Sequence, residues 1–426
     1  MDGVAVTVTA QRNEGRKSRD FRLFVLGQCA TALGSSFTAF ALPLLLYRQT
    51  GSPAVMGAGF AVGFLPYLLF GLLVGALADR YERRRLMAFA NVCSCLVLLA
   101  APVMTLFGPV PVGVYLAMGF LLTTFRIVTG TGTVTVVAAL AGKDDLVRAN
   151  GRLQAGTSAM DMLGPVIAGA AVAVVPAVDL LLVDATAFIL SAVTLLLIRT
   201  PLTPDREQPG QAAGDLRGRM RELGAEIGEG LRFVLGHRVL RSVSALMVLV
   251  NFVYAGAPSQ LVVLAKTHLD AGDRQLAWLY AAGSAGIVVM SLCAARISER
   301  ARFPVLTLGS LSVVGLCTAA LGLVPHYTAA LFAWAGVAAF SALFNINALS
   351  LRQRIVPDRL LGRVTTTSMV LAWCAVPLGG MAGGLVVEGP AGVGAFYTGM
   401  GVLLVLLALG FVFSPLGSVK KVSEIV

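Results

Sequence analysis

The chain has 426 residues, of which 57% are hydrophobic and only 13% are charged. A soluble protein cannot bury so much apolar surface, so this composition indicates that lipid is the solvent. The net charge of +11 could suggest a nucleic-acid partner. Nearly all Lys and Arg residues fall in segments between apolar runs, however, as the positive-inside rule describes for membrane proteins. We therefore predict a lipid bilayer and no nucleic acid as the partner.

Twelve apolar runs follow one another along the chain. Each approaches the roughly 20 residues that a helix needs to cross a hydrocarbon core of about 30 Å. The runs cover residues 22–47, 55–78, 86–107, 112–141, 150–176, 178–198, 240–265, 276–295, 303–324, 327–351, 361–387 and 391–414. Short strands of alternating polarity, which a membrane barrel would need, do not occur in the sequence. We predict an all-α integral membrane protein with twelve transmembrane helices.

The placement of charge predicts how the chain is oriented. With the N-terminus inside, the outer loops hold only three cationic residues, Arg48, Lys266 and Arg274. This asymmetry predicts a multi-pass protein of the cell membrane with both termini in the cytoplasm. Asp184 and Glu388 lie nearer the outer face, and we expect them to be solvated or to cap helices.

The longest polar stretch divides the runs six and six. It predicts an N-terminal bundle at 1–198, a cytoplasmic linker at 199–238 and a C-terminal bundle at 239–426. The two halves show signs of an internal repeat, since Glu82-Arg83 after the second run matches Glu299-Arg300 after the eighth. Apolar residues recur in the linker at helical spacing, at Leu216, Met220, Leu223, Ile227, Leu231 and Val234. They predict an amphipathic helix on the inner leaflet, or a regulatory or partner-binding element.

A cluster of charge separates the second and third runs. Its sequence is Gly75-Ala-Leu-Ala-Asp79-Arg80-Tyr-Glu82-Arg83-Arg84-Arg85. A charge at the bilayer centre costs at least about 3 kcal/mol, so the cluster must lie at the membrane surface. The pattern resembles the signature between helices 2 and 3 of the major facilitator superfamily. Locally it is similar to macrolide-efflux and enterobactin-exporter-like proteins of the drug/proton antiporter branch.

This resemblance implies the major facilitator fold, with two six-helix repeats. It also implies that Gly75, Asp79, Arg80, Arg83 and Arg84 form a conformational latch, in which the aspartate meets the N-terminal end of helix 11. Glu82 departs from the family, which usually has glycine at that position. The alternative is a solvated basic loop.

A second resemblance lies in the fourth run, at Leu122-Thr-Thr-Phe-Arg126-Ile-Val-Thr129-Gly130-Thr-Gly132. It is similar to a motif of proton-driven antiporters in which glutamine usually stands at position 129. Arg126 lies about 20 Å from the helix end at 1.5 Å per residue, so it needs a partner or water. Asp161 is the one acid near the middle of a predicted helix, at about the same depth. We predict that Asp161 and Arg126 couple transport to protons, with a structural ion pair as the alternative.

The fifth run contains Gly151, Gly164, Pro165 and Gly169, which resemble the antiporter signature of the same superfamily. Met160 and Ala168 replace two of its glycines. Small residues allow close helix contact and proline permits a bend. Polar and aromatic residues in other runs are candidates for substrate contact or helix packing. They are Gln28, Asn251, Tyr254, Gln260, Trp334, Asn345, Asn347 and Trp373.

The resemblance implies that the function is secondary active transport by alternating access. The expected activity is export of a small amphipathic organic compound, such as a drug, macrolide, siderophore or endogenous metabolite, in exchange for protons. A proton-coupled importer of a small nutrient and a non-transporting membrane sensor are the alternatives. No phosphate-binding loop or zinc-protease motif occurs, so we expect neither a cofactor nor an enzyme. The cysteines indicate no metal site, and we expect a monomer.

Overall fold

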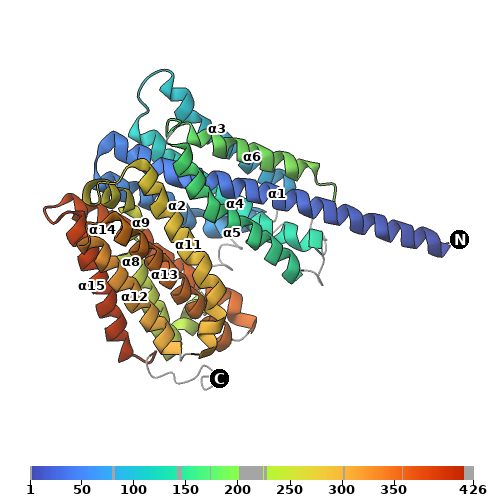
Figure 1. The fold of residues 1–426 in the computed structure, drawn as a ribbon. Coiled ribbons are helices and arrows are strands. Elements are labelled where there is room, and N and C mark those ends of the chain that lie inside the picture. Colours follow the sequence, from blue (N-terminus) through green and yellow to red (C-terminus); the bar gives the residue numbers. More distant parts are fainter. Residues whose placement is uncertain are drawn as a thin grey trace. The chain divides into compact units, whose positions relative to one another are not determined.

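The computed structural model describes residues 2–78, 82–141, 146–172, 174–200, 224, 228–300, 303–356 and 358–416. Helices and turns, without strands, make up this part of the chain (Figure 1). The helices of the first half are α1 (Asp2–Thr50), α2 (Pro53–Ala78), α3 (Arg83–Thr105), α4 (Val112–Ala141), α5 (Leu146–Ala171) and α6 (Leu180–Leu197). Those of the second half are α8 (Arg238–Tyr254), α9 (Gly256–Ser259), α10 (Leu261–Val263), the π-helix η1 (Leu264–His268), α11 (Asp273–Arg300), α12 (Phe303–Leu323), α13 (Tyr327–Ile355), α14 (Asp358–Glu388) and α15 (Gly392–Val412).

Within the described residues, eleven segments are long and apolar enough to cross a membrane. The long helix outside this set is α5, which carries Arg148, Arg152 and Asp161. With α5 counted, the arrangement is consistent with the twelve crossings predicted. The all-α membrane architecture is confirmed.

Large apolar side chains are exposed on many of the helices, as a lipid solvent allows, and α3 shows the pattern. On α3 the exposed residues Phe89, Val92, Leu96 and Val103 recur at steps of three, four and seven, so they form one stripe. The opposite face is buried and carries Asn91, whose amide donates to the hydroxyl of Ser191 on α6 at 3.0 Å. Polar groups thus face inward and hydrocarbon faces outward, the reverse of a soluble helix.

Contacts divide the chain into two compact units, which we describe separately. Unit 1 comprises Met1–Leu45 and Leu65–Ala213, and unit 2 comprises Leu46–Phe64 and Gly214–Val426. The core at one end of unit 1 is a cluster that joins helices α1, α3, α4, α5 and α6. Its buried members are Phe21, Phe24, Met87, Val136, Val137, Leu140, Ala149, Leu153, Leu195 and Ile198. Nearby, the buried carboxylate of Asp20 accepts the backbone N–H groups of Arg199 and Thr200 just after α6, at 3.0 and 2.9 Å.

The end of α1 and the first half of α2 belong to unit 2. Gly384 of α14 lies so close that a Cβ there would stand 2.6 Å from the carbonyl oxygen of Pro53. Glu388 accepts the backbone N–H of Ala54 at 2.9 Å and so caps the first turn of α2, one of the two roles expected for it. At the same end of α1, Arg48 contacts Asp273, whose second oxygen accepts from Lys266 at 2.6 Å.

The linker helix predicted from Leu216 to Val234 lies largely outside the described residues. Its end is described, and residues 228–236 are helical up to a bend at His237. Phe233 and Val234 pack against Leu240 of α8 and against Val356 and Val364 beside and within α14. This segment therefore belongs to the core of unit 2.

Two helices differ from the sequence prediction. The run predicted at 22–47 is the later part of a longer helix, which begins at Asp2. The run predicted at 240–265 is broken after Tyr254 into α8, α9, α10 and η1. Pro258, in α9, cannot donate a hydrogen bond to the carbonyl of Tyr254, so one bond of a continuous α-helix is missing at this break.

Candidate functional site

An open pocket of about 230 Å³ lies on unit 1, lined by helices α1, α3, α4, α5 and α6, and Arg126 and Asp161 are exposed in it. Nine of its twelve lining residues are polar, and they include one cation and one carboxylate. The lining residues are Gln28, Thr31, Ala32, Ser35, Asn91, Arg126, Thr129, Gly130, Thr133, Thr157, Asp161 and Phe188. Ligand pockets usually measure about 300–1,000 Å³, so this open pocket has room for several waters rather than for a large organic molecule.

Arg126 and Asp161 both face this open pocket, from α4 and α5 respectively. Their charges attract each other, yet no ion pair between described residues joins them. Asp161 is therefore a carboxyl group on the wall of the open pocket, with a guanidinium within electrostatic reach. Thr129, which stands where the family has glutamine, donates its hydroxyl to the carbonyl of Arg126 at 3.1 Å. That donor is consequently committed to the helix backbone.

The glycines of α5 bring α5 against α1 and so shape the open pocket. A Cβ at Gly164 would meet the side chain of Ser36, and one at Gly156 would lie 2.6 Å from the sulfur of Cys29. Gly151, at the other end of the motif, has open space around it. Pro165 and Gly169 are buried within α5. The motif thus contains one glycine required for the close approach and one that is not.

Asp184 is a buried carboxyl that we did not predict. It lies on α6, is 1% exposed, and accepts the hydroxyl of Thr38 on α1 at 2.5 Å. Its other oxygen has no hydrogen-bond partner. We expected it to be solvated or to cap a helix, which is wrong, because α1 covers it at Gly34. A Cβ at Gly34 would stand 2.7 Å from the unpaired oxygen. The only signal in the sequence was an acid within an apolar run.

The predicted latch is described only in part. Asp79 and Arg80 lie outside the described residues, and Gly75 is in the last turns of α2. Arg83 and Arg84 open α3. Arg84 donates to the carbonyl of Ile198 at 2.8 Å and pairs with Glu82 at 2.8 Å. Glu82, the departure from the family, also pairs with Arg85 at 2.7 Å, so it holds the basic cluster together.

Of the candidates for substrate contact, Gln28 alone lines the open pocket described above. Several of the others make packing contacts in unit 2. Gln260 is fully buried and donates to the carbonyl of Pro53 at 3.1 Å. Asn251 donates to the carbonyl of Ala372 at 3.1 Å, and Trp334 packs against Gly283. Asn347 is 4% exposed, Tyr254 bonds to Ser341, and Asn345 and Trp373 are exposed.

A sequence profile of the Major Facilitator Superfamily matches residues 24–365. Together with the helical membrane fold, this match shows that the chain belongs to the major facilitator superfamily of membrane transporters. The family resemblance stated from the charge cluster after Gly75 is confirmed.

Relatives and solved structures are similar over almost the whole chain. The multidrug efflux pump Tap of Mycolicibacterium fortuitum is 28% identical over 410 residues, which is 92% of this chain and 95% of the relative. Macrolide efflux protein A of Streptococcus pyogenes is 20% identical over 386 residues, covering 90% and 93%. The crystal structure of the nucleoside transporter NupG has a TM-score of 0.71 at 13% identity, covering 93% of this chain and 98% of that one. An inward-facing bacterial homologue of the lysosomal transporter Spinster has a TM-score of 0.69 at 14% identity, covering 93% and 96%. These structural likenesses show the fold.

Proposed function

We propose that the chain exports a small, amphipathic organic compound across the cell membrane in exchange for protons. Transport proceeds by alternating access between bundles at 1–198 and 239–426, joined by the linker at 199–238. Both termini face the cytoplasm, and the working form is a monomer. The drug-efflux relatives support the direction and the class of cargo. Gly75, Asp79, Arg80, Arg83 and Arg84 serve as the latch that is made and released during this cycle.

The open pocket shared by Arg126 and Asp161 is the observation that supports proton coupling. A carboxyl beside water and a guanidinium can take up a proton when its surroundings are wet and release it when the guanidinium approaches. The absence of a direct ion pair between these two residues leaves the carboxyl accessible for that exchange. The modest volume of the pocket suits a proton site.

Everted membrane vesicles containing the full chain test this proposal. A pH difference of one unit is worth about 1.4 kcal/mol per proton, so one-for-one exchange can sustain a roughly tenfold cargo gradient. We expect a macrolide or a dye to accumulate in wild-type vesicles when their lumen is acidic. Asp161→Asn should reduce the ratio of cargo concentration inside to outside the vesicles to about one. Asp161→Glu should retain part of the accumulation.

The control is passive exchange of labelled cargo across the same vesicles without a pH gradient. We expect Asp161→Asn to keep this exchange, because only the proton step is removed. Full accumulation by Asp161→Asn would contradict the coupling role. Movement of cargo together with protons, out of an acidic lumen, would instead support the importer.

A further inference from the structure

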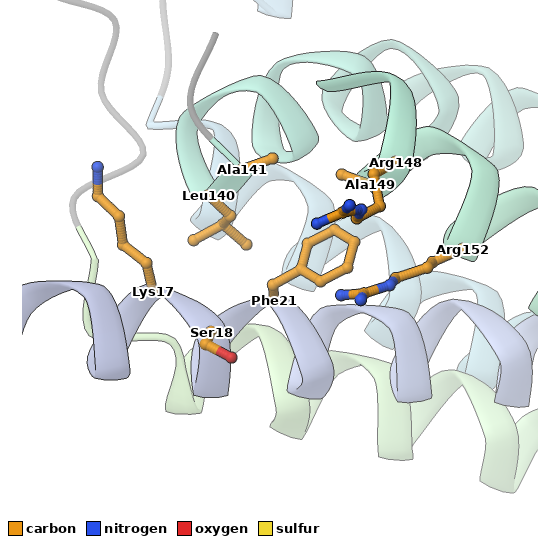
Figure 2. A pocket seen from close by; sticks show the side chains of 8 residues that line it. All are labelled: Lys17, Ser18, Phe21, Leu140, Ala141, Arg148, Ala149 and Arg152. Carbon is orange, nitrogen blue, oxygen red and sulfur yellow. The ribbon is translucent and has the colours of Figure 1, made fainter. Parts of the chain in front are cut away.

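A basic pocket at one end of unit 1 takes no part in the proposed proton cycle. It has a volume of about 490 Å³, within the range of ligand sites, and lies between α1, the last turn of α4 and the first turns of α5. The lining residues are Lys17, Ser18, Phe21, Leu140, Ala141, Arg148, Ala149 and Arg152 (Figure 2). Among these described residues are three cations and no acid.

The geometry of the cations favours a compact anion. Arg148 and Arg152 stand four residues apart on α5, so their side chains share one helix face. In Figure 2 both guanidinium groups extend toward the ring of Phe21, and Lys17 rises from α1 on the other side of Leu140. Two guanidinium groups on one helix face can both donate to the same anion. Arginine forks match the oxygens of a phosphate group in particular.

The rest of the pocket favours a ligand that is also apolar. Its floor is formed by Phe21, Leu140 and Ala149, which are 8%, 3% and 5% exposed and belong to the core cluster of unit 1. The pocket lies at the membrane boundary, because Lys17, Arg19 and Asp20 of α1 immediately precede its apolar run, and Arg148 and Arg152 stand in the first turns of α5. Phosphate-binding cations above an apolar floor, at the depth of the headgroups, match an amphipathic anion from the bilayer.

We propose that this pocket binds the phosphate headgroup of an anionic phospholipid. Arg148 and Arg152 contact the phosphate oxygens, Lys17 adds positive charge at the other side of the pocket, and the apolar floor receives the start of the acyl chains. The lipid joins α1 to the last turn of α4 and the first turns of α5, and so stabilises the core cluster of unit 1. The lipid belongs to the cytoplasmic leaflet if the proposed orientation of the chain holds. The existence of the binding site does not depend on that orientation.

The test uses the purified full chain in detergent. Bound lipid is counted by native mass spectrometry, and thermal unfolding is followed with added phosphatidylglycerol or phosphatidylcholine. We expect phosphatidylglycerol to be retained and to raise the Tm by a few degrees more than phosphatidylcholine. The double variant Arg148→Gln/Arg152→Gln should bind phosphatidylglycerol about tenfold or more weakly. Ser18→Glu, which places a negative charge on the pocket wall, should also weaken binding.

The matched control is Arg238→Gln/Arg241→Gln, which removes two exposed arginines at the first turn of α8 in unit 2. It loses the same charge and should keep the phosphatidylglycerol shift. The proposal is overturned if the Arg148/Arg152 variant retains the full shift, or if both double variants lose it equally. It is overturned as well if inorganic phosphate alone reproduces the shift, because the ligand would then be a soluble anion. Neither the count of bound lipid nor the unfolding temperature depends on transport activity.

Discussion

At the scale of single residues, Asp184 shows most clearly the cost of burying a group that can carry a charge. A buried carboxylate with one hydrogen bond is stable only if its charge is balanced or its proton is kept. The Thr38 hydroxyl supplies the single hydrogen bond, and Arg126 is near enough to attract both Asp184 and Asp161. Asp161 lines the pocket it shares with Arg126, and Asp184 is not among the lining residues of that pocket. We therefore infer that the first exchanges protons, while the second holds α1 against α6.

Substitution separates these two roles. Asp184→Asn keeps the volume and the oxygen that accepts from Thr38, so we expect a folded protein with proton-driven accumulation unchanged. Asp184→Ala leaves the Thr38 hydroxyl unpaired and opens a void, and should cost about 1–3 kcal/mol of stability. Thermal unfolding and vesicle accumulation measure the two effects. Loss of gradient-driven transport in a well-folded Asp184→Asn would show instead that Asp184 shares the proton step.

At the scale of helices, the contact between α5 and α1 shows how a motif acts. Gly164 faces Ser36 with no room for a Cβ, whereas Gly151 faces open space. The same device recurs in unit 2, where Gly384 of α14 meets Pro53 of α2. Small residues at such points let backbones approach, which is the main source of helix association where lipid removes the hydrophobic drive.

This contact predicts a rescue experiment. Gly164→Ala should destabilise the protein by about 1–3 kcal/mol, because the new methyl group overlaps Ser36. The double variant Gly164→Ala/Ser36→Gly removes the overlapping atoms and should recover most of that loss. Gly151→Ala is the matched control on the same helix and should be neutral or stabilising by up to about 1 kcal/mol. Equal unfolding temperatures for Gly164→Ala and wild type would refute the close packing.

At the scale of the whole molecule, the distribution of Lys and Arg predicts which side each turn faces. Phe107, in the turn between α3 and α4, is 87% exposed and should face outward. Leu235, at the end of the linker, is 50% exposed and should face the cytoplasm. These two positions lie on opposite sides of the bilayer if the charge asymmetry sets the orientation.

Thiol labelling in intact cells measures this orientation. A membrane-impermeant maleimide should label Phe107→Cys in intact cells, and should label Leu235→Cys only after permeabilisation. The parent chain, whose cysteines lie within helices, gives the background for both. The reverse pattern would place the termini outside and would contradict the positive-inside prediction for this chain.

The spans and their order follow from sequence because a bilayer imposes one strict condition. Every backbone polar group must be satisfied inside the hydrocarbon, so a run of about 20 apolar residues has to form a helix. The helices could therefore be predicted without knowing which neighbours they pack against. The charge cluster after Gly75 then indicated the family. The break at Pro258 is the exception, since proline is tolerated in many membrane helices and its local effect depends on neighbours.

What tertiary structure alone decided is the direction in which each side chain points. A helix that is apolar on all sides carries no periodic signal, so its rotation about its own axis is set by packing with its neighbours. Sequence placed Asp161 and Arg126 at one depth, but only the folded unit brings them to one open pocket. Packing likewise buried Asp184 under Gly34 and turned Gln260 toward Pro53. The sequence therefore predicts how deep a residue lies in the membrane, whereas the contacts between helices decide which way its side chain points.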